Sequence, residues 1–378
     1  MKTTEIIEGK TKLLIPSKRT ISKKDIVFYN PDMKLSRDIS VLVAKAIKPK
    51  KFCDLFAGTG ARGIRIANET GMNNILLNDK NPEAFKLMKK NVEINGLDLI
   101  IKNSDANSIL NEDSFDFIDI DPFGSPVTFI DSAIMALKNN GILAVTATDT
   151  SALCGTYPRA CRRKYDSTSL RTEYYNELGL RIFLGYIIRS GLKHNLSFTP
   201  LFSHCTRHYF RVYLRGEKSR RKCNEAAKKI KFLQHCFRCL NRVFSDLNNL
   251  KEKCRCGFKF SNAGPLWSEK FADTTFCKKL EKNIDNKSNQ RDILKIIGII
   301  RKEQKIKNPY YNLHRIFQKK GIPAKPTEYI VDNLRANGFY VSKTHFSALG
   351  IRSNADVFQL YDIPPLRRIR KYKNKDIV

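Results

Sequence analysis

The feature that most constrains the fold is a strand, a glycine turn and a helix that come directly one after another in residues 50–69, KKFCDLFAGTGARGIRIANE. The apolar run Phe52–Phe56 predicts a short strand, Gly58 and Gly60 interrupt it, and the spacing of the apolar residues from Ile64 onward predicts a helix. Such a unit opens a βαβ fold, and its glycines let the backbone approach a ligand closely. Because many doubly wound domains carry this turn, it indicates a nucleotide-type pocket without identifying the ligand.

Further strands and helices alternate downstream of this unit. A second strand ends at Asp79, and a helix comes after it in which Asn81 is the expected N-cap and Pro82 the first residue. Asp79 stands about where the ribose-binding acid of such folds lies. Three more strands are predicted at Leu99–Lys102, Phe115–Asp121 and Gly141–Asp149. This alternation predicts an α/β domain whose parallel sheet binds its ligand at the C-terminal ends of the strands.

Two cofactors use this fold together with a ribose-binding acid: a nicotinamide dinucleotide and S-adenosylmethionine. A dinucleotide requires a G-x-G-x-x-G turn to hold its pyrophosphate. Gly58, Gly60 and Gly63 satisfy that spacing, so the turn excludes neither cofactor. The choice between them depends on the fourth strand and the turn at its end, FDFIDIDPFGSP at residues 115–126.

The fourth strand ends in a carboxylate. Asp119 and Asp121 share one face of it, because side chains two positions apart point the same way. Pro122 cannot extend the ladder, so the Asp121 carboxylate and the Pro122 carbonyl become acceptors at the ligand edge, beside the ring of Phe123. Two acceptors next to an aromatic ring suit one task, which is to aim the exocyclic amine of a nucleobase at a methyl sulfonium and to receive its proton. The alternative is that Asp121 only caps a helix beginning near Pro126.

The later part of the chain carries nearly all of the positive charge. The whole sequence has 69 Lys and Arg against 37 Asp and Glu, a net charge of +32, whereas residues 1–150 hold 21 basic and 19 acidic residues. This asymmetry indicates a catalytic module joined to a polyanion-binding one. Arginines and aromatics alternate in RHYFRVYLR (207–215) and RACRRKY (159–165), as they do in nucleic-acid sites. The alternative is a Lys-rich solvated surface.

Five motifs taken together resemble the tRNA (guanine-26 N2)-dimethyltransferase family over nearly the whole chain. They are FYNPDMKLSRD (28–38), AGTGARGIR (57–65), NDKNPEAF (78–85), DIDPFGSP (119–126) and GTYPRACRRKY (155–165). Their combination is far more specific than any single motif. The resemblance implies a Rossmann-like class I methyltransferase fold that uses S-adenosylmethionine and acts on tRNA.

The resemblance also implies roles for individual residues. The methyl donor would be held by Arg37, Arg62, Asp79 on the ribose, and Asp105 and Ala106 on the adenine, next to Gly58 and Gly60 of the turn. Asp121 would be the catalytic carboxylate, with Pro122 and Phe123 beside it and Phe28 helping to sandwich the target guanine. The residues themselves leave three alternatives open: Phe28 as a core side chain, Arg37 paired with Asp38 or Asp32, and Arg65 in place of Arg62.

Four cysteines in the middle of the chain have the spacing of a metal site. Cys236 and Cys239 form a C-x-x-C pair, Cys254 and Cys256 form a C-x-C pair, and 14 residues lie between the two pairs. Two such pairs resemble a zinc ribbon or knuckle, so we predict a structural zinc ion, with His235 as an alternative ligand. Free thiols or a disulfide are the other interpretations of this cluster.

The C-terminal part, from about Asn289, shows a pattern of helix, helix and short strand, which predicts an α+β, winged-helix-like unit. NGFYVSKTHF (337–346) resembles the C-terminal domain with which the family engages tRNA, and the basic tail LRRIRKYKNK (366–375) is interpreted as a phosphate-contacting arm or a disordered end. We therefore divide the chain into a methyltransferase domain (1–218), a zinc-ribbon-like cysteine module (219–275) and a C-terminal tRNA-binding domain (276–378).

The sequence thus predicts a cytoplasmic enzyme that methylates the N2 amine of guanine 26 in tRNA, giving N2-methyl- and N2,N2-dimethylguanosine. It shows no signal peptide, no protein partner and no apolar run close to the roughly 20 residues that span a bilayer. Two other functions stay open: methylation of an adenine amine in DNA or RNA, and non-catalytic RNA binding with an inert pocket. A nicotinamide dehydrogenase would not explain the basic part of the chain.

Overall fold

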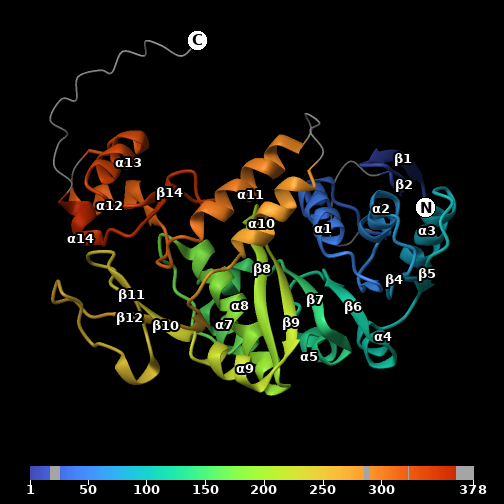
Figure 1. Ribbon diagram of the computed structural model, residues 1–378, viewed down its shortest axis with the longest axis horizontal. Coiled ribbons are helices and arrows are strands. Elements are labelled where there is room, and N and C mark those ends of the chain that lie inside the picture. Colours follow the sequence, from blue (N-terminus) through green and yellow to red (C-terminus); the bar gives the residue numbers. More distant parts are fainter. Residues whose placement is uncertain (18–25, 285–289, 322, 363–378) are drawn as a thin grey trace, which may run out of the picture.

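The computed structural model describes residues 1–17, 26–284, 290–321 and 323–362, and the basic tail predicted at 366–375 lies outside them. Its centre is a seven-stranded sheet in the order β5-β4-β3-β6-β7-β9-β8 (Figure 1). The strands are β3 (Phe52–Asp54), β4 (Ile75–Asn78), β5 (Ile100–Lys102), β6 (Phe115–Ile120), β7 (Leu137–Ala147), β8 (Leu196–Thr206) and β9 (Tyr209–Lys218). The strands β3 to β7 pair in parallel, as predicted, whereas β8 and β9 form an antiparallel hairpin against β7 that the sequence analysis did not include.

Helices cover the sheet, and the central strands are accordingly buried on both faces. The helices of this part are α1 (Lys34–Ile47), α2 (Ala61–Thr70), α3 (Pro82–Glu93), α4 (Ala106–Glu112), α5 (Val127–Ala136), α6 (Thr150–Leu153), α7 (Pro158–Tyr165) and α8 (Tyr175–Lys193), with a 3-10 turn η1 (Pro31–Met33) before α1. The start predicted for α3 is confirmed, because the Asn81 side chain accepts a hydrogen bond from the Glu83 N–H at 2.9 Å. The strands therefore end on turns that deliver polar side chains to one edge of the sheet.

An N-terminal hairpin of β1 (Thr3–Glu8) and β2 (Thr11–Pro16) packs against α2 and α3. Asn91 on α3 fixes it, since its side chain accepts from the Leu14 N–H at 2.7 Å and donates to the Leu14 carbonyl at 3.0 Å. The same amide donates to the Thr59 carbonyl in the glycine turn at 2.8 Å. This hairpin thus brings the end of β1 to the ligand side of the sheet.

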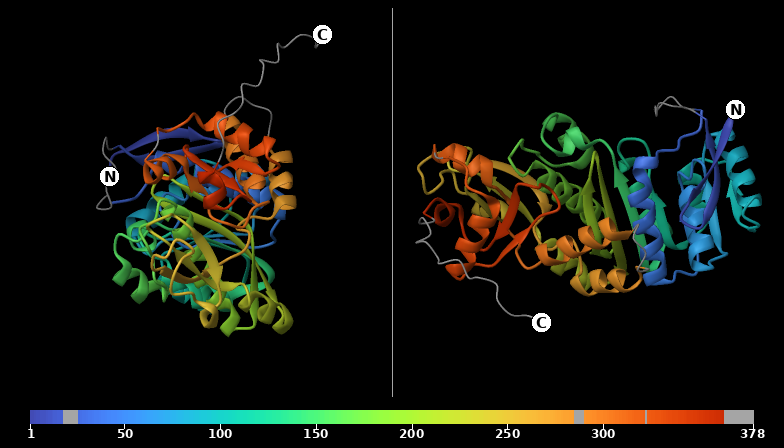
Figure 2. Two further views of the ribbon diagram at one scale, coloured as in Figure 1. Left: turned by 90° about the vertical axis from the view of Figure 1, so that its left-hand side faces the viewer. Right: turned by 90° about the horizontal axis from the view of Figure 1, so that it is seen from above.

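The rest of the chain adds two smaller sheets, in the orders β11-β10-β12 and β13-β15-β14. Their elements are α9 (Arg220–Ala227), β10 (Ile230–His235), β11 (Arg242–Ser245), η2 (Leu247–Asn249), β12 (Ser261–Trp267), α10 (Thr274–Lys282), α11 (Arg291–Glu303), β13 (Tyr311–Asn312), α12 (Leu313–Lys320), α13 (Thr327–Ala336), β14 (Val341–Lys343), β15 (Gly350–Ser353) and α14 (Val357–Tyr361). Figure 2 shows an elongated molecule with the N-terminal hairpin and the last helices at opposite ends.

One hydrophobic core extends from the main sheet into α10 and α11, while α12 to α14 pack in a second, separate core. The boundary at residue 276 and the winged-helix-like and zinc-ribbon-like assignments stay predictions. Within the described residues, every helix is too short or too polar to cross a membrane.

Candidate active site

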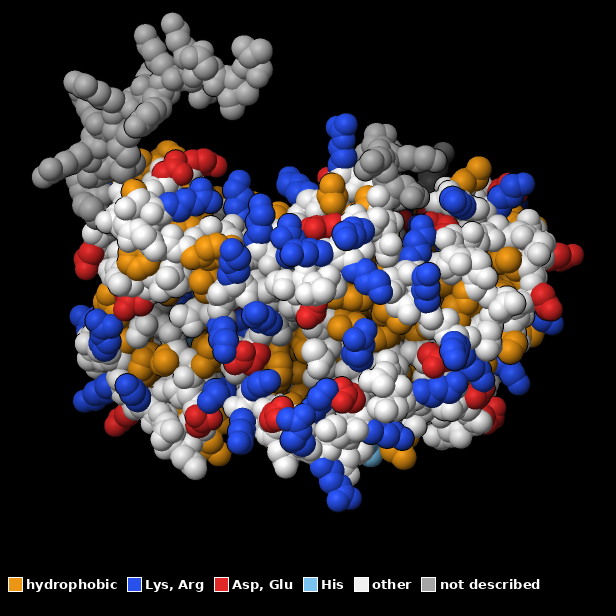
Figure 3. Space-filling view, in the orientation of Figure 1, with side chains coloured by type: hydrophobic (Ala, Val, Ile, Leu, Met, Phe, Trp, Pro, Cys, Tyr) orange, Lys and Arg blue, Asp and Glu red, His pale blue; other side chains and the backbone are white. Residues whose placement is uncertain are grey.

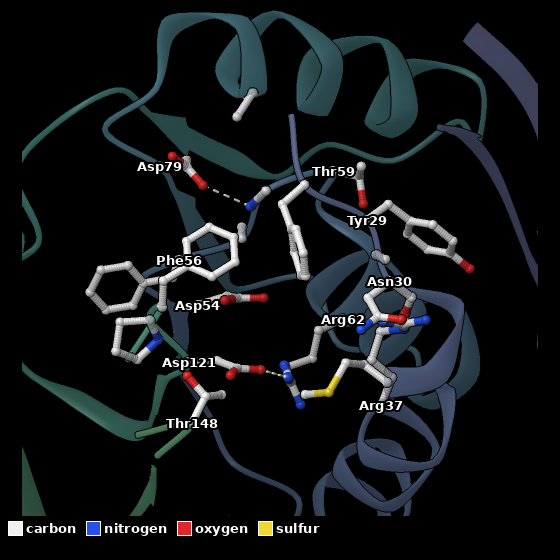
Figure 4. Close-up of a pocket in the computed structure, with 18 of the residues that line it drawn as sticks. Tyr29, Asn30, Arg37, Asp54, Phe56, Thr59, Arg62, Asp79, Asp121 and Thr148 are labelled. Carbon is white, nitrogen blue, oxygen red and sulfur yellow. Dashed lines mark hydrogen bonds and ion pairs between the residues drawn. The ribbon is translucent and has the colours of Figure 1, made fainter. Parts of the chain in front are cut away.

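A cavity of about 670 Å³ opens at the C-terminal ends of the parallel strands (Figure 4). Its wall includes the following predicted site residues: Phe28, Arg37, Gly58, Arg62, Asp79, Asp121, Pro122 and Phe123. It also includes residues that the sequence analysis did not assign to a pocket, among them Asp54, Thr148, Arg207, His208 and Tyr209. Three predicted residues, Gly60, Asp105 and Ala106, do not line it.

The glycine turn holds the predicted ribose-binding acid. The φ angles of Gly58 and Gly60 are +55° and +79°, and a Cβ on Gly58 would stand 3.0 Å from the Phe28 carbonyl oxygen. The Gly58 N–H donates to Asp79 Oδ2 and the Asn81 N–H donates to Asp79 Oδ1, both at 2.9 Å. Burial raises the pKa of Asp79, although these two bonds favour its charged form. Asp79 is therefore held in one orientation at the cavity wall.

Asp121 lies at the rim of the cavity and forms an ion pair with Arg62, whose Nη2 donates to Asp121 Oδ2 (Figure 4). Ser40 holds the guanidinium from the other side, because its Oγ accepts from Arg62 Nη1 at 2.6 Å. The Asp121 side chain keeps 16% of its surface exposed. The next helix begins at Val127 without a side-chain cap, so the alternative that Asp121 caps it is wrong.

Asp119 shares that face of β6 but is completely buried. Arg211 Nη1 donates to Asp119 Oδ1 at 3.0 Å, and Arg62 Nε lies 3.6 Å from the same oxygen. Burial would lower the pKa of Arg211, but the charge of Asp119 raises it well above its usual value. The shared face is confirmed, since both carboxylates reach Arg62. Asp119 offsets the positive charge of the buried Arg62 and Arg211, whereas Asp121 faces the cavity.

Asp54, the last residue of β3, is a buried acid that the sequence analysis missed. It is 1% exposed, and neither of its oxygens has a hydrogen-bond partner among the described residues. Burial, and after it the charge of Asp119, raises the pKa of Asp54 to about 7, although the charge of Arg62 lowers it. The available signal was its position, because it ends a strand directly before the glycine turn. An unpaired carboxyl in a cavity wall indicates a place where a ligand supplies the partner.

Arg37 lines the cavity with a partner from the N-terminal hairpin. Its Nε donates to Glu8 Oε1 at 2.7 Å and its Nη2 donates to Glu8 Oε2 at 2.5 Å. Burial would raise the pKa of Glu8, but Arg37, with the Tyr29 hydroxyl and Arg65, lowers it to about 2. Glu8 therefore stays ionised and fixes Arg37. The alternative that Arg37 pairs with Asp38 or Asp32 is wrong, because the carboxylate that Arg37 contacts is Glu8 of β1.

Arg65, the alternative to Arg62, faces away from the cavity. Its Nη1 lies 2.9 Å from Glu8 Oε1 and 2.6 Å from Asp38 Oδ1, and its Nε lies 2.8 Å from Glu69 Oε1. Arg65 is absent from the cavity lining, whereas Arg62 is part of it. The geometry supports Arg62 as the cofactor ligand, and this role stays a prediction.

Phe28 and Phe123 meet at the mouth of the cavity. Their ring centroids are 4.6 Å apart with an interplanar angle of 82°, an edge-to-face contact. Phe123 is 53% exposed and Phe28 is half-buried, so the alternative that Phe28 is a core side chain is wrong. A guanine can stack between these rings only if one of them moves, because they now touch.

The turn between β8 and β9 closes the cavity on another side. Arg207, at the tip, forms an ion pair with Asp32 across the mouth. Tyr209 is 3% exposed, and its hydroxyl has no hydrogen-bond partner among the described residues. Burial and the nearby charge of Asp121 raise the pKa of Tyr209. The start of the RHYFRVYLR motif therefore belongs to the pocket.

Known proteins resemble this chain over nearly its whole length. It matches the family of N2,N2-dimethylguanosine tRNA methyltransferases over residues 9–364. The chain belongs to this family. The tRNA (guanine(26)-N(2))-dimethyltransferase of Methanobrevibacter smithii is 38% identical to it over 377 residues, covering 96% of this chain and 97% of the relative. The enzyme of that name from Methanothermobacter thermautotrophicus is 37% identical over 368 residues, covering 94% and 97%.

A solved structure supports the assignment of this chain to the same family. Trm1 from Pyrococcus horikoshii, in complex with S-adenosyl-L-methionine, superimposes with a TM-score of 0.87 and 33% sequence identity, covering 95% of this chain and 99% of that one. The predicted Rossmann-like class I methyltransferase fold is confirmed, and so is the resemblance on which it partly depended.

Asp105 and Ala106, the two residues predicted to contact adenine, lie beside the cavity rather than in its wall. Asp105 caps α4, since its Oδ1 accepts from the Asn107 N–H at 2.9 Å, and Lys80 Nζ lies 3.6 Å from its Oδ2. Ala106 is buried as the first residue of that helix. They come after β5, the neighbour of β4, and their contact with adenine stays a prediction.

The four cysteines come together at one end of the second sheet. The Sγ atoms of Cys236 and Cys256 are 3.5 Å apart, those of Cys239 and Cys254 are 3.6 Å apart, and all four lie within 4.8 Å of one another. A disulfide is wrong, because its sulfurs would be about 2.05 Å apart. Four sulfurs at these separations fit around one tetrahedral zinc ion with bonds of about 2.3 Å. His235 is outside the group, with its Nδ1 3.2 Å from the Tyr174 hydroxyl.

Proposed function

We propose that this protein transfers methyl groups from S-adenosylmethionine to the exocyclic N2 amine of guanine 26 in tRNA, giving N2-methyl- and N2,N2-dimethylguanosine. The observation that carries the proposal is Asp121, a carboxylate at the cavity rim beside the exposed ring of Phe123. The Methanobrevibacter and Methanothermobacter relatives, which match nearly the whole chain, carry the name of this reaction.

S-adenosylmethionine would supply a methyl group activated on a sulfonium. The cavity fits this ligand because the two unpaired oxygens of Asp54 call for a cationic group, and the amino end of the methionyl part provides one. Asp79, fixed by the glycine turn, is assigned to the ribose hydroxyls. Arg37 and Arg62 are assigned to the methionyl carboxylate, and the residues at the start of α4 to the adenine edge.

Asp121 would orient the target amine. The N2 amine of guanine is a weak nucleophile, because its lone pair is delocalised into the ring. One Asp121 oxygen accepts a hydrogen bond from the amine, and the Pro122 carbonyl accepts a second, which directs the lone pair at the methyl group. As the nitrogen bonds to the methyl carbon, the bond from that carbon to sulfur would break and leave a neutral thioether. Asp121 would take the proton from the nitrogen, which gains positive charge. Arg62 pairs with this carboxylate and keeps it aimed at the cavity.

The target guanine must leave its stack to reach this carboxylate. Phe123 and Phe28 would receive the extruded base after their edge-to-face contact opens. The same site accepts N2-methylguanosine for a second transfer, since one N–H remains for Asp121. An adenine N6 amine also offers two N–H donors, so the choice of guanine rests on the names of the relatives.

We assign methyl transfer to residues 1–218 and tRNA binding mainly to residues 276–378, with the cysteine module between them. Phosphate contacts from the basic part make tRNA binding weaker at high salt. The zinc ion is structural in this proposal, because α14 packs on the cysteine group through Phe358 and Tyr361 and, among the described residues, the sulfurs pack with apolar side chains.

Elemental analysis of the purified protein tests the zinc assignment. We expect about one zinc per chain, and less than about a tenth of that in Cys254→Ser/Cys256→Ser. Cys223→Ser, a change on α9 outside the group, is the control and should keep its metal. A metal-free wild-type protein with the same melting temperature after chelation would contradict the assignment.

The function itself is tested with an unmodified tRNA transcript, S-adenosylmethionine and mass spectrometry of the nucleosides. We expect N2-methylguanosine first and N2,N2-dimethylguanosine later, and neither product from a transcript with adenine at position 26. Methylated adenosine would favour the adenine-amine enzyme instead. A protein that binds the transcript but shows no calorimetric binding of S-adenosylmethionine would be a non-catalytic RNA-binding protein.

A further inference from the structure

Helix α7 is attached to two residues that lie next to the cavity wall in the sequence. Its last residue, Tyr165, accepts a hydrogen bond from Ser125 Oγ at 3.1 Å and donates to Asp149 Oδ1 at 2.6 Å. Ser125 belongs to the loop after Asp121, and Asp149 is next to Thr148, which lines the cavity. The helix is therefore fixed to the segments that would receive the target base.

The buried and exposed faces of α7 differ sharply. Cys161 and Tyr165 are fully buried and hold the helix in place, whereas Arg159 and Arg163 are exposed. These two arginines are one helical turn apart, with about 5–6 Å between their Cβ atoms, and so share a face. Tyr157, directly before the helix, is 63% exposed, which is unusual for a large ring.

The two arginines have no protein partner in the part of the chain that the structure describes. The other cations of α7 are occupied: Lys164 Nζ lies 3.0 Å from Asp149 Oδ2, and Arg162 donates to the Thr168 hydroxyl at 3.3 Å. Lys and Arg spread widely over the face shown in Figure 3, so charge alone does not locate an RNA path. In the described part of the chain, Arg159 and Arg163 are free cations on a helix that is tied to loops next to the cavity wall, and Tyr157 adds an exposed aromatic ring. These features together do locate one.

We infer that Arg159 and Arg163 bind phosphates of the nucleotides that flank the target guanine, while the Tyr157 ring packs on a neighbouring base. This inference rests on the proposed function. The strand on both sides of an extruded base must be held while the base is out of its stack. A rigid helix with a pair of arginines one turn apart holds adjacent phosphates, and an aromatic ring replaces part of the lost stacking.

The test compares two double variants that change the net charge equally. Arg159→Ala/Arg163→Ala removes the α7 pair, and Arg220→Ala/Arg221→Ala removes two exposed arginines from α9. Because β9 runs antiparallel to β7, α9 begins after the end of β9 at the sheet edge opposite the cavity. We expect the α7 variant to bind the tRNA transcript at least about tenfold more weakly, with a salt slope smaller by about 1.4, at about 0.7 for each single-strand phosphate contact.

A second readout isolates the role at the target base. A transcript with 2-aminopurine at position 26 should brighten when wild-type protein unstacks that base. We expect this signal to fall at least about threefold with the α7 variant at saturating protein, and to persist with the α9 variant. Tyr157→Ala should reduce the same signal, and calorimetric binding of S-adenosylmethionine should be unchanged in all three.

The outcomes separate this inference from the proposed function. If wild-type protein methylates the transcript but the α7 and α9 variants behave alike in affinity, salt slope and fluorescence, the α7 inference is overturned and the function stands. If the wild-type protein yields no methylated guanosine, the proposed function fails, and with it the premise of the inference. A weakened α9 variant with an unaffected α7 variant would place the RNA on the opposite edge and overturn the inference.

Discussion

Two buried groups of arginines and carboxylates in this molecule differ in how completely they are satisfied. The cavity group comprises Asp54, Asp119, Asp121, Arg62 and Arg211, and the junction group comprises Glu177, Glu303, Arg181, Arg352 and His345. The junction group connects α8, which packs against the main sheet, with α11 and β15. In the cavity group, by contrast, one carboxyl is unpaired among the described residues and another reaches the surface.

The junction carboxylates have full sets of partners. Glu303 Oε1 accepts from His345 Nδ1 at 2.6 Å and its Oε2 accepts from Arg352 Nε at 2.8 Å. Glu177 Oε1 lies 2.6 Å from Arg352 Nη2, and its other oxygen accepts the Tyr310 N–H at 3.0 Å. An unpaired buried charge is costly, so a group in which every carboxylate is paired belongs to the fold, and a group with an unpaired carboxyl indicates a ligand site.

The largest effect expected in either group is the loss of activity in Asp121→Asn. Asparagine keeps the shape but cannot take the proton, so methyl transfer should fall by about 10²–10⁴-fold. Rates from single turnovers and the binding of S-adenosylmethionine by calorimetry check this, with binding retained within a few-fold. Activity close to the wild-type rate would remove the chemical distinction between the two groups.

A substitution in the junction group should lower the stability of the fold rather than the rate of methyl transfer. Glu303→Ala removes the acid that pairs with His345 and one of the two acids that pair with Arg352. We expect a loss of about 3–5 kcal/mol in unfolding free energy. Burial opposes the charge on Glu303, but His345 and Arg352 lower its pKa to about 2 from 4.5, so the stabilisation is complete above pH 4.5 and is lost as pH falls toward 2.

Denaturant unfolding at several pH values checks the effect of Glu303→Ala. Glu281→Ala is the matched control, because it breaks a partly exposed ion pair with Arg301, a residue of the same helix as Glu303, and should cost less than about 1 kcal/mol. Equal losses in the two variants would mean that the junction group contributes no more than a surface pair.

Asp54→Asn should stabilise the cofactor-free protein at high pH. The pKa of Asp54 is raised from 3.8 to about 7, so between these values the folded protein holds a proton that the unfolded chain has lost. Folding stability therefore falls as pH rises through this window, and the variant escapes that loss. We expect a gain on the order of 1–3 kcal/mol at about pH 8 that vanishes near about pH 4. Thermal unfolding across this range checks it, and binding of S-adenosylmethionine should weaken at the same time.

The smallest effect is expected at a pair that belongs to neither group. Lys193 Nζ lies 3.3 Å from Asp131 Oδ1, and both side chains are more than half exposed. Water and salt screen such a pair, so Asp131→Asn should change the unfolding free energy by less than about 0.5 kcal/mol and leave methyl transfer intact. A larger change would show that proximity alone, rather than burial, sets the effects in the two groups.

Local sequence patterns predicted much of this molecule correctly. The alternation of strands and helices predicted the parallel sheet, and Asn81 and Pro82 predicted the start of α3. The strand that ends before Pro122 predicted that Asp121 lies at the end of the strands, where the cavity opens. The resemblance pointed to Arg37 and Arg62, but not to the acids that hold them. The antiparallel hairpin β8–β9 was missed, since alternation of buried residues does not indicate which strand a segment pairs with.

Local sequence is enough to predict where strands end, which side chains share a strand face and which four cysteines can meet. These features depend on residue period, turn chemistry and short separations along the chain. Three features of the site became visible with the folded chain: Glu8 fixes Arg37, Arg62 rather than Arg65 faces Asp121, and Asp54 has no partner among the described residues. Those outcomes depend on which distant segments pack together and exclude water, and the charges of buried groups depend on that packing.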